Sequence, residues 1–246
     1  MAPIALSHLV LDRPGEQARL LVLVHGYGEP AADLTERLGL IDPDARFRVV
    51  VPDAPFEWRG KAIWHRAMHA REEAEQQYLA SVEALDELLG ELEREVGLAA
   101  ADAVVGGFSQ GGGLALGLLL SADVRNRPAA GFGVCSFPPM VRGFRVDLAA
   151  AAGRPYFLSS ARRDSFASIE LSRAGGALLR ESGLDLTYVE SEGEHEMTDT
   201  AARQIGEWLA HLGEPAGTTA PGDDLLDGVD GRAAYGDIWV QVPPGS

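Results

Sequence analysis

Short apolar runs alternate with longer amphipathic segments along most of this chain. Runs of about five apolar residues, bounded by polar or turn-forming residues, are typical of strands that are buried on both faces of a sheet. Such runs lie at residues 20–24, 47–51, 103–105, 129–136, 155–159 and 184–189. A looser alternation over residues 4–11 predicts one further, antiparallel strand before the turn at Pro14.

The segments between these runs have the three- and four-residue spacing of amphipathic helices. The longest covers residues 71–96, where apolar positions from Tyr78 to Val96 share one face and acidic residues lie opposite. Other helices are predicted at residues 31–38, 110–120, 168–181 and 198–212, and residues 56–64 are expected to be irregular. Alternating strands and helices predict an α/β fold, with a mostly parallel sheet of about seven strands and helices on both faces.

Residues 103–120, AVVGGFSQGGGLALGLLL, read as a strand, a sharp turn and a helix. Ser109 stands at the turn within Gly-Phe-Ser-Gln-Gly, the Gly-x-Ser-x-Gly pattern of a nucleophile elbow. Its glycines allow the strand and the helix to approach closely beneath a strained serine. Because the chain has 29 glycines, the pattern could arise by chance. It is informative because it stands between a predicted strand and a predicted helix. A phosphate-binding turn is the alternative, but Gly-x-Gly-x-x-Gly at the first strand and Gly-Lys-Ser/Thr are both missing.

A serine nucleophile needs a general base, and that base needs a carboxylate to orient it. His195 and His211 are the two histidines that follow Ser109. His195 comes directly after the last predicted strand and is the candidate base. His211 lies near the end of the last predicted helix, where capping or surface exposure explains it better.

Asp164 is the candidate orienting acid, because it follows the strand at residues 155–159 through a short loop. Asp147, in a connection, and Asp185, at the entrance to a strand, are weaker candidates. A simple role for Asp164 as a loop or capping acid ahead of Ser168 is the structural alternative.

Acyl-transfer chemistry also needs hydrogen-bond donors for an oxyanion. The N–H of Gln110 begins the helix behind the serine, and the N–H of Tyr27 lies in the His-Gly-Tyr-Gly turn after the first buried strand. His25 of this turn is interpreted as a residue that orients the loop. Apolar side chains that follow strands are candidates for a substrate pocket or for plain core: Trp58, Trp64, Met68, Phe137, Pro138 and Met140.

Composition limits the number of domains and the partners. With 246 residues, 46% of them hydrophobic, one domain is expected over residues 1–212. Residues 213–246 are rich in Gly, Pro and Asp; residues 238–242 within them either belong to a mobile tail or add a strand to an exposed sheet edge. A net charge of −16 disfavours nucleic acid and anionic membranes as partners.

Other general features are those of a cytoplasmic protein. The single cysteine, Cys135, excludes an intramolecular disulfide and is expected to be a small buried apolar residue. The N-terminal residues lack the basic region of a signal peptide, and no run approaches the roughly 18 apolar residues of a membrane span. We expect neither a metal nor a cofactor.

Together the motifs resemble the carboxylesterase and acyl-protein thioesterase family of α/β-hydrolases, over about residues 20–212. They are His-Gly-Tyr-Gly at 25–28 followed by Asp33-Leu34, Pro-Asp-Ala-Pro at 52–55, Gly-Phe-Ser-Gln-Gly-Gly at 107–112, and Asp164 and His195 in that order. The resemblance implies an α/β-hydrolase three-layer sandwich without a cap domain.

The resemblance also implies hydrolysis of small carboxylic esters or thioesters by a monomer or homodimer without a cofactor. Ser109 would be the nucleophile, His195 the base and Asp164 its orienting acid, with the N–H groups of Tyr27 and Gln110 as the oxyanion hole. A non-catalytic small-molecule receptor, and an acyltransferase or perhydrolase with the same residues, stay open. The sequence departs from the family pattern where Ala-Arg-Arg precedes Asp164, Ser-Phe-Ala follows it, and a glutamate precedes His195.

Overall fold

A seven-stranded sheet forms the centre of the computed structural model, which describes residues 4–14, 17–66, 71–212, 223–235 and 238–243. The strand order is β1-β3-β2-β6-β7-β9-β10, and every pairing is parallel except that of β1 with β3. The strands are β1 (His8–Val10), β2 (Arg19–Val24), β3 (Phe47–Pro52), β6 (Val104–Phe108), β7 (Ala130–Val134), β9 (Pro155–Ala161) and β10 (Asp185–Ser191). The predicted fold class and the antiparallel first strand are confirmed.

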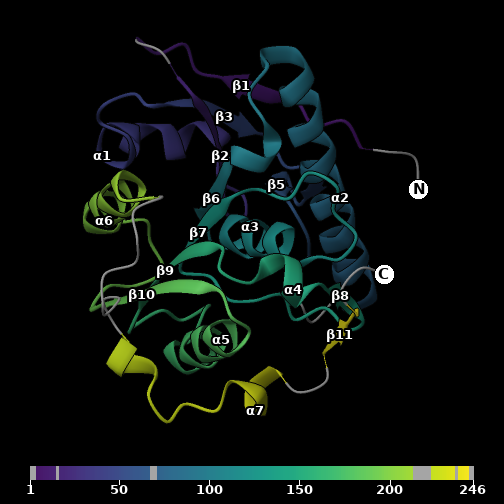
Figure 1. Ribbon diagram of the computed structural model, residues 1–246, viewed down its shortest axis with the longest axis vertical. Coiled ribbons are helices and arrows are strands. Elements are labelled where there is room, and N and C mark those ends of the chain that lie inside the picture. Colours follow the sequence, from purple (N-terminus) through teal and green to yellow (C-terminus); the bar gives the residue numbers. More distant parts are fainter. Residues whose placement is uncertain (1–3, 15–16, 67–70, 213–222, 236–237, 244–246) are drawn as a thin grey trace.

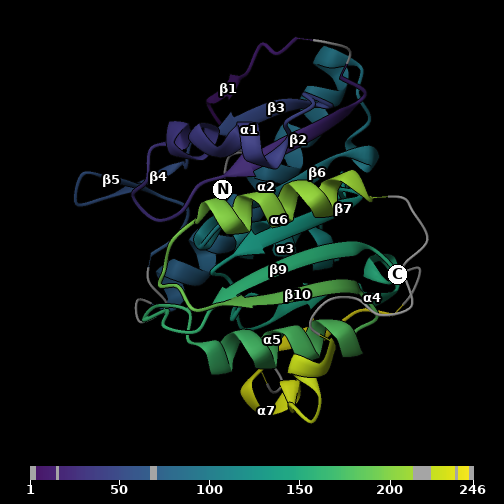
Figure 2. The same cartoon turned by 90° about the vertical axis from the view of Figure 1, so that its left-hand side faces the viewer.

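Helices cover both faces of this sheet (Figures 1 and 2). On one face lie α1 (Leu38–Ile41) and α6 (Asp199–Ala210); on the other lie α2 (Arg71–Val96), α3 (Gln110–Leu120) and α5 (Ile169–Glu181). Successive residues of β2 therefore enter different apolar clusters: Leu21 packs with the α1 and α6 side, and Val22 with the α2 and α3 side. Burial on both faces explains why these strands are continuously apolar.

Two expectations for the N-terminal half were wrong in detail. Residues 56–64 are not irregular, because β4 (Phe56–Trp58) and β5 (Lys61–Ile63) form an antiparallel hairpin that projects from the sheet (Figure 2). Its turn places Arg59 and Gly60 at φ 52° and 75°. The helix expected at residues 31–38 is a 3₁₀ helix (Ala31–Arg37) that continues into the four residues of α1.

Short elements complete the second half of the chain. The strand β8 (Phe144–Val146) and the helix α4 (Leu148–Ala151), which were not predicted, lie between β7 and β9. A 3₁₀ helix (Asp223–Leu226), α7 (Gly231–Tyr235) and β11 (Trp239–Gln241) follow α6. The strand β11 pairs in parallel with β8 in a separate two-stranded sheet, and does not extend the main sheet.

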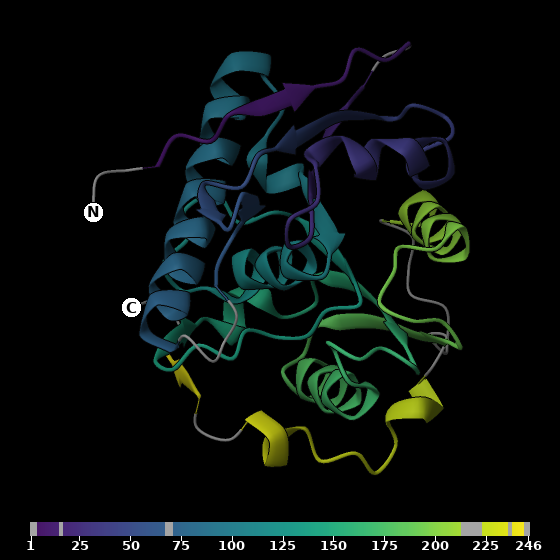
Figure 3. The same cartoon turned by 180° about the vertical axis from the view of Figure 1, so that it is seen from behind.

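The described part of this C-terminal segment (residues 223–235 and 238–243) lies beneath α5 and, through β11, against β8 (Figure 3). Leu226 and Tyr235 are 1% and 2% exposed, and Leu226 belongs to the core cluster on the α2 and α3 side. The first part of the predicted tail, residues 213–222, lies outside the described residues. No helix in the described part of the chain is long and apolar enough to cross a membrane.

Candidate active site

Ser109 lies at a sharp turn between β6 and α3. Its φ of 52° and ψ of −115° fall where non-glycine residues are strained. The turn is held on both sides, since Ser109 N–H donates to Val134 O at 2.8 Å and its carbonyl accepts from Gly113 N–H at 3.2 Å. The strain therefore persists because the neighbouring strand and the first helical turn fix the backbone, and it leaves the hydroxyl at the carboxyl end of the sheet.

The glycines around Ser109 are required by close backbone contacts. A Cβ atom on Gly107 or Gly111 would lie 2.0 or 1.9 Å from Val24 O in β2. A Cβ atom on Gly112 would lie 2.5 Å from Ser136 Oγ. Because these distances are far below van der Waals contact, only glycine allows β2, the turn and α3 to approach this closely.

A chain of hydrogen bonds joins the three residues that the sequence singles out. His195 Nε2 lies 3.0 Å from Ser109 Oγ, and His195 Nδ1 lies 2.7 Å from Asp164 Oδ2. The Asp164 side chain is fully buried. Its other oxygen accepts the N–H groups of Phe166 and Ala167 at 2.7 and 2.8 Å. Asp164 is thus held by its own loop with one oxygen directed at His195.

The weaker candidates have other roles. Asp147 caps α4 by accepting Ala150 N–H at 2.9 Å, and Asp185 begins β10 with an exposed side chain. Ser168 caps α5 itself, so Asp164 is not the cap of that helix. His211 lies exposed at the end of α6, with Nδ1 2.7 Å from Glu207 O.

Aromatic rings contact the imidazole of His195. The ring of buried Phe108 lies 4.9 Å from it, and the ring of Phe166 lies 5.0 Å from it, centroid to centroid. Phe166 is 78% exposed, although large apolar side chains are usually buried. No sequence motif marks this contact, because it depends on how the loop that carries Asp164 folds beside the histidine.

The loop after β2, residues 25–29, is fixed by bonds to several segments. His25 Nε2 accepts Ala54 N–H at 3.2 Å while its Nδ1 lies 2.8 Å from Gly26 O, the pattern expected of a residue that orients the loop. Burial lowers the pKa of His25 and so favours its neutral form. Gly28 N–H donates to Ala62 O at 2.8 Å. We call residues 25–29 the Tyr27 loop.

Gln110 contributes to the site through both its backbone N–H and its side chain. As the first residue of α3 it has an N–H without an acceptor inside the helix. Its side chain accepts Trp64 N–H at 3.1 Å and donates to His65 O at 2.8 Å, which ties the elbow to the segment after β5. The sequence pointed only to the first of these roles.

The pocket candidates do not form one group. Trp64 is fully buried and donates its Nε1–H to His25 O at 3.0 Å, so it belongs to the core and supports the Tyr27 loop. Pro138 is buried against Gly175 of α5. Trp58 is half-buried, with the Arg66 guanidinium 3.4 Å from the centre of its ring. Phe137 and Met140, in the loop after β7, are also half-buried. Met68 lies outside the described residues.

Cys135 lies beside the hydrogen-bonded pair of Asp164 and His195. With Asp164 and His195 it makes the one group of possible metal ligands found in the described part of the chain. Burial raises the pKa of its thiol to about 12, so the thiol stays protonated, and Asp164 and His195 already bond to each other. These residues do not suit a resident metal. Cys135 is buried, as expected, with Sγ 3.7 Å from Glu194 O.

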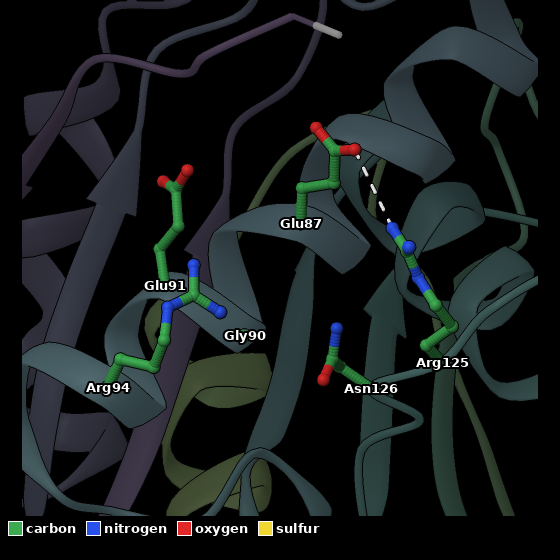
Figure 4. Close-up of a pocket in the computed structure, with 6 residues that line it drawn as sticks. All are labelled: Glu87, Gly90, Glu91, Arg94, Arg125 and Asn126. Carbon is green, nitrogen blue, oxygen red and sulfur yellow. Dashed lines mark ion pairs between the residues drawn. The ribbon is translucent and has the colours of Figure 1, made fainter.

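A surface hollow lies at the other end of the sheet from Ser109, Asp164 and His195. It measures about 470 Å³ and is lined by Glu87, Gly90, Glu91 and Arg94 of α2 and by Arg125 and Asn126 (Figure 4). Arg125 and Asn126 precede β7, so the hollow lies at the amino ends of the strands, whereas Ser109 follows the end of β6. Ligands of parallel sheets bind beyond the carboxyl ends. The hollow is therefore not the active site.

Known proteins resemble this chain in fold and in overall sequence. The carboxylesterases of Bacillus cereus and Mesorhizobium loti superpose with TM-scores of 0.73 and 0.71 at 21% and 19% identity, covering 83% and 85% of this chain and 93% and 97% of theirs. The Bacillus subtilis protein MhqD is 26% identical over 195 residues, 79% of this chain and 94% of its own. The model of the phospholipase/carboxylesterase family matches residues 8–212. The chain therefore belongs to this family of hydrolases.

Proposed function

We propose that the protein is a serine hydrolase that cleaves carboxylic esters or thioesters through an acyl-enzyme on Ser109. The observation that carries this proposal is the hydrogen-bond chain from Asp164 through His195 to Ser109. It supplies a nucleophile, a base and an orienting acid in one line, on a backbone that is already held in place.

In this proposal His195 carries its proton on Nδ1. Asp164 Oδ2 accepts a hydrogen bond from that Nδ1–H, so the lone pair of Nε2 faces the Ser109 hydroxyl. Ser109 Oγ forms a bond to the substrate carbonyl carbon while its proton moves to Nε2. The buried carboxylate of Asp164 stabilises the imidazolium that results.

The carbonyl oxygen becomes an oxyanion in this step and needs donors. The Gln110 N–H, at the positive end of α3, and the Tyr27 N–H are the donors in this proposal. The imidazolium then gives its proton to the leaving oxygen or sulfur as the bond to the acyl carbon breaks. Water, deprotonated by the same histidine, attacks the acyl-enzyme and releases the acid and Ser109.

Labelling with a fluorophosphonate probe tests this function directly. We expect the wild type to be labelled at Ser109 and to hydrolyse activated short-chain esters, and Ser109→Ala to do neither. A panel of acyl chain lengths, offered as oxygen esters and as thioesters, then identifies the preferred bond. A folded wild-type protein that is neither labelled nor active would refute the proposal and favour a small-molecule receptor.

A further inference from the structure

The Tyr27 loop is closed by an acidic side chain that no sequence motif singled out. Glu29 Oε2 accepts the Gly26 N–H at 3.0 Å, and the N–H of Glu29 lies 3.5 Å from Gly26 O. Glu29 therefore holds both peptide planes that meet at Gly26. Tyr27, which follows Gly26 at the tip of the turn, is 38% exposed.

The Glu29 carboxyl group lies against the residues of the active site. A Cβ atom on Gly26 would be 2.8 Å from Glu29 Oε2 and 2.9 Å from the ring of Phe108. The Phe108 ring in turn contacts the imidazole of His195. The carboxyl group thus fills the space beside the residue that precedes Ser109, and the missing side chain at Gly26 makes room for it.

We propose that Glu29 is a positioning residue that aims the Tyr27 N–H at the oxyanion. This inference rests on the proposed function. In a trans peptide the N–H points opposite to the C=O, so fixing Gly26 O fixes the direction of the Tyr27 N–H. The Gly26–Tyr27 plane is held at Gly26 O by His25 Nδ1 and by the Glu29 N–H, which side-chain substitutions leave in place. Glycine has the freest backbone of any residue, so the Glu29 carboxyl group, by fixing the Gly26 N–H, limits rotation of the other plane about Gly26.

The charge of Glu29 has opposing effects on the reaction. Burial raises the pKa of its carboxyl group, and so does Asp33; the Gly26 N–H, His195 and Arg37 lower it. Since the interaction with His195 is mutual, an ionised Glu29 stabilises the imidazolium, but it also repels the oxyanion. These effects oppose each other in the transition state, where both charges form together. The hydrogen bond to Gly26 therefore matters more than the charge.

Three substitutions at Glu29 separate geometry from charge. Glu29→Gln keeps an oxygen that can accept the Gly26 N–H but removes the charge, Glu29→Asp keeps the charge but shortens the reach, and Glu29→Ala removes both. We expect Asp and Ala to lower kcat by about tenfold or more, below the roughly 10²–10³-fold loss of a whole donor, with KM changed less than about twofold. Gln should restore most of that loss. Glu36→Ala, an exposed acid on the adjoining 3₁₀ helix, is the control.

Each outcome has one meaning, with folding checked by the melting temperature of every variant. A larger loss for Gln than for Asp would overturn the positioning role in favour of a charge effect. Asp and Ala variants as active as the wild type would also overturn it, while the wild type's activity and its labelling at Ser109 would leave the proposed function intact. If Glu29→Ala lowers the melting temperature, the comparison of Glu29→Asp with Glu29→Gln still tests the positioning role. An inactive wild type refutes the proposed function itself.

Discussion

The active site and the C-terminal segment are fixed in different ways, the first at the end of the main sheet and the second against α5 and β8. At the site, strained or close-packed backbone and buried polar bonds fix the chain within a few residues of Ser109, Asp164 and Gly26. The C-terminal segment is anchored by widely spaced buried side chains such as Leu226 and Tyr235 and, at its end, by the pairing of β11 with β8. Activity should therefore depend mainly on the first region and stability on the second, and substitutions in the two regions should separate these properties.

The largest expected effect is that of Ser109→Ala. Removing the nucleophile should lower kcat by about 10⁶-fold, because the other members of the chain cannot act without it. Stability should stay about the same, since alanine keeps the same backbone strain and removes only the hydroxyl group. Ester turnover and thermal melting measure the two effects. A variant that loses several degrees of melting temperature would contradict the separation.

Asp164→Asn is the next test of the active site. The amide would offer an N–H to His195 or force the other tautomer, which should lower kcat by about 10⁴-fold. The remaining side-chain oxygen can still accept the N–H groups of Phe166 and Ala167, so the loop should keep its conformation. Asp147→Asn, at the cap of α4, is a matched control that should leave kcat unchanged. Similar losses from both variants would remove Asp164 from its assigned role.

The same contrast explains what the sequence could predict. Ser109 was singled out by the Gly-x-Ser-x-Gly motif, and Asp164 and His195 by their order after it at the ends of predicted strands, which a parallel sheet brings together. Residues 238–242 suggested a strand, but not that its partner would be β8, because two strands of three residues give no periodic pattern. The hairpin turn at Arg59-Gly60 was missed because it lacks the usual Asn-Gly signal. The role of Glu29 depends on a fold-back that no local spacing shows.

Tyr235→Ala tests the C-terminal segment. The ring is 2% exposed and packs beside α5, so its loss should cost about 3 kcal/mol, or less if the segment simply detaches. Hydrogen exchange of residues 223–243 and thermal melting distinguish these cases. Activity on short esters should change less than about threefold, as expected of a buried side chain that packs against α5 away from the chemistry. Tyr235→Phe is the control, since the hydroxyl makes only a 3.5 Å contact to Leu171 O.

Arg173→Met should give a smaller loss of stability that depends on pH. Glu190 in β10 is 1% exposed and accepts two bonds from Arg173, at 2.7 and 2.8 Å, and one from Arg162. These bonds lower the pKa of Glu190 below its ordinary value of 4.5. Their stabilisation is therefore present above pH 4.5 and is lost as pH falls through the folded pKa.

The expected cost of Arg173→Met at pH 7 is about 1–3 kcal/mol, the usual value of a charged hydrogen bond, and it should shrink at pH 3.5. Urea unfolding at both pH values measures it. Arg203→Met, an exposed arginine of α6, is the control. An equal cost at both pH values would show that the arginine stabilises the fold through packing alone.

Phe166→Ala should have the smallest overall effect among these variants. Phe166 is an apolar side chain in the active-site region, yet its 78% exposure means that little stability depends on it, and we expect a change below about 0.5 kcal/mol. Its ring contacts His195, so its loss should lower kcat/KM by a few-fold, and more for bulky aryl esters than for small alkyl esters. Leu79→Ala, 45% exposed on α2, is the matched control for an exposed apolar residue elsewhere. If Phe166→Ala destabilises the protein and leaves activity unchanged, activity and stability do not separate at this residue. The ring would then stabilise the loop that carries Asp164 and would not contact the substrate.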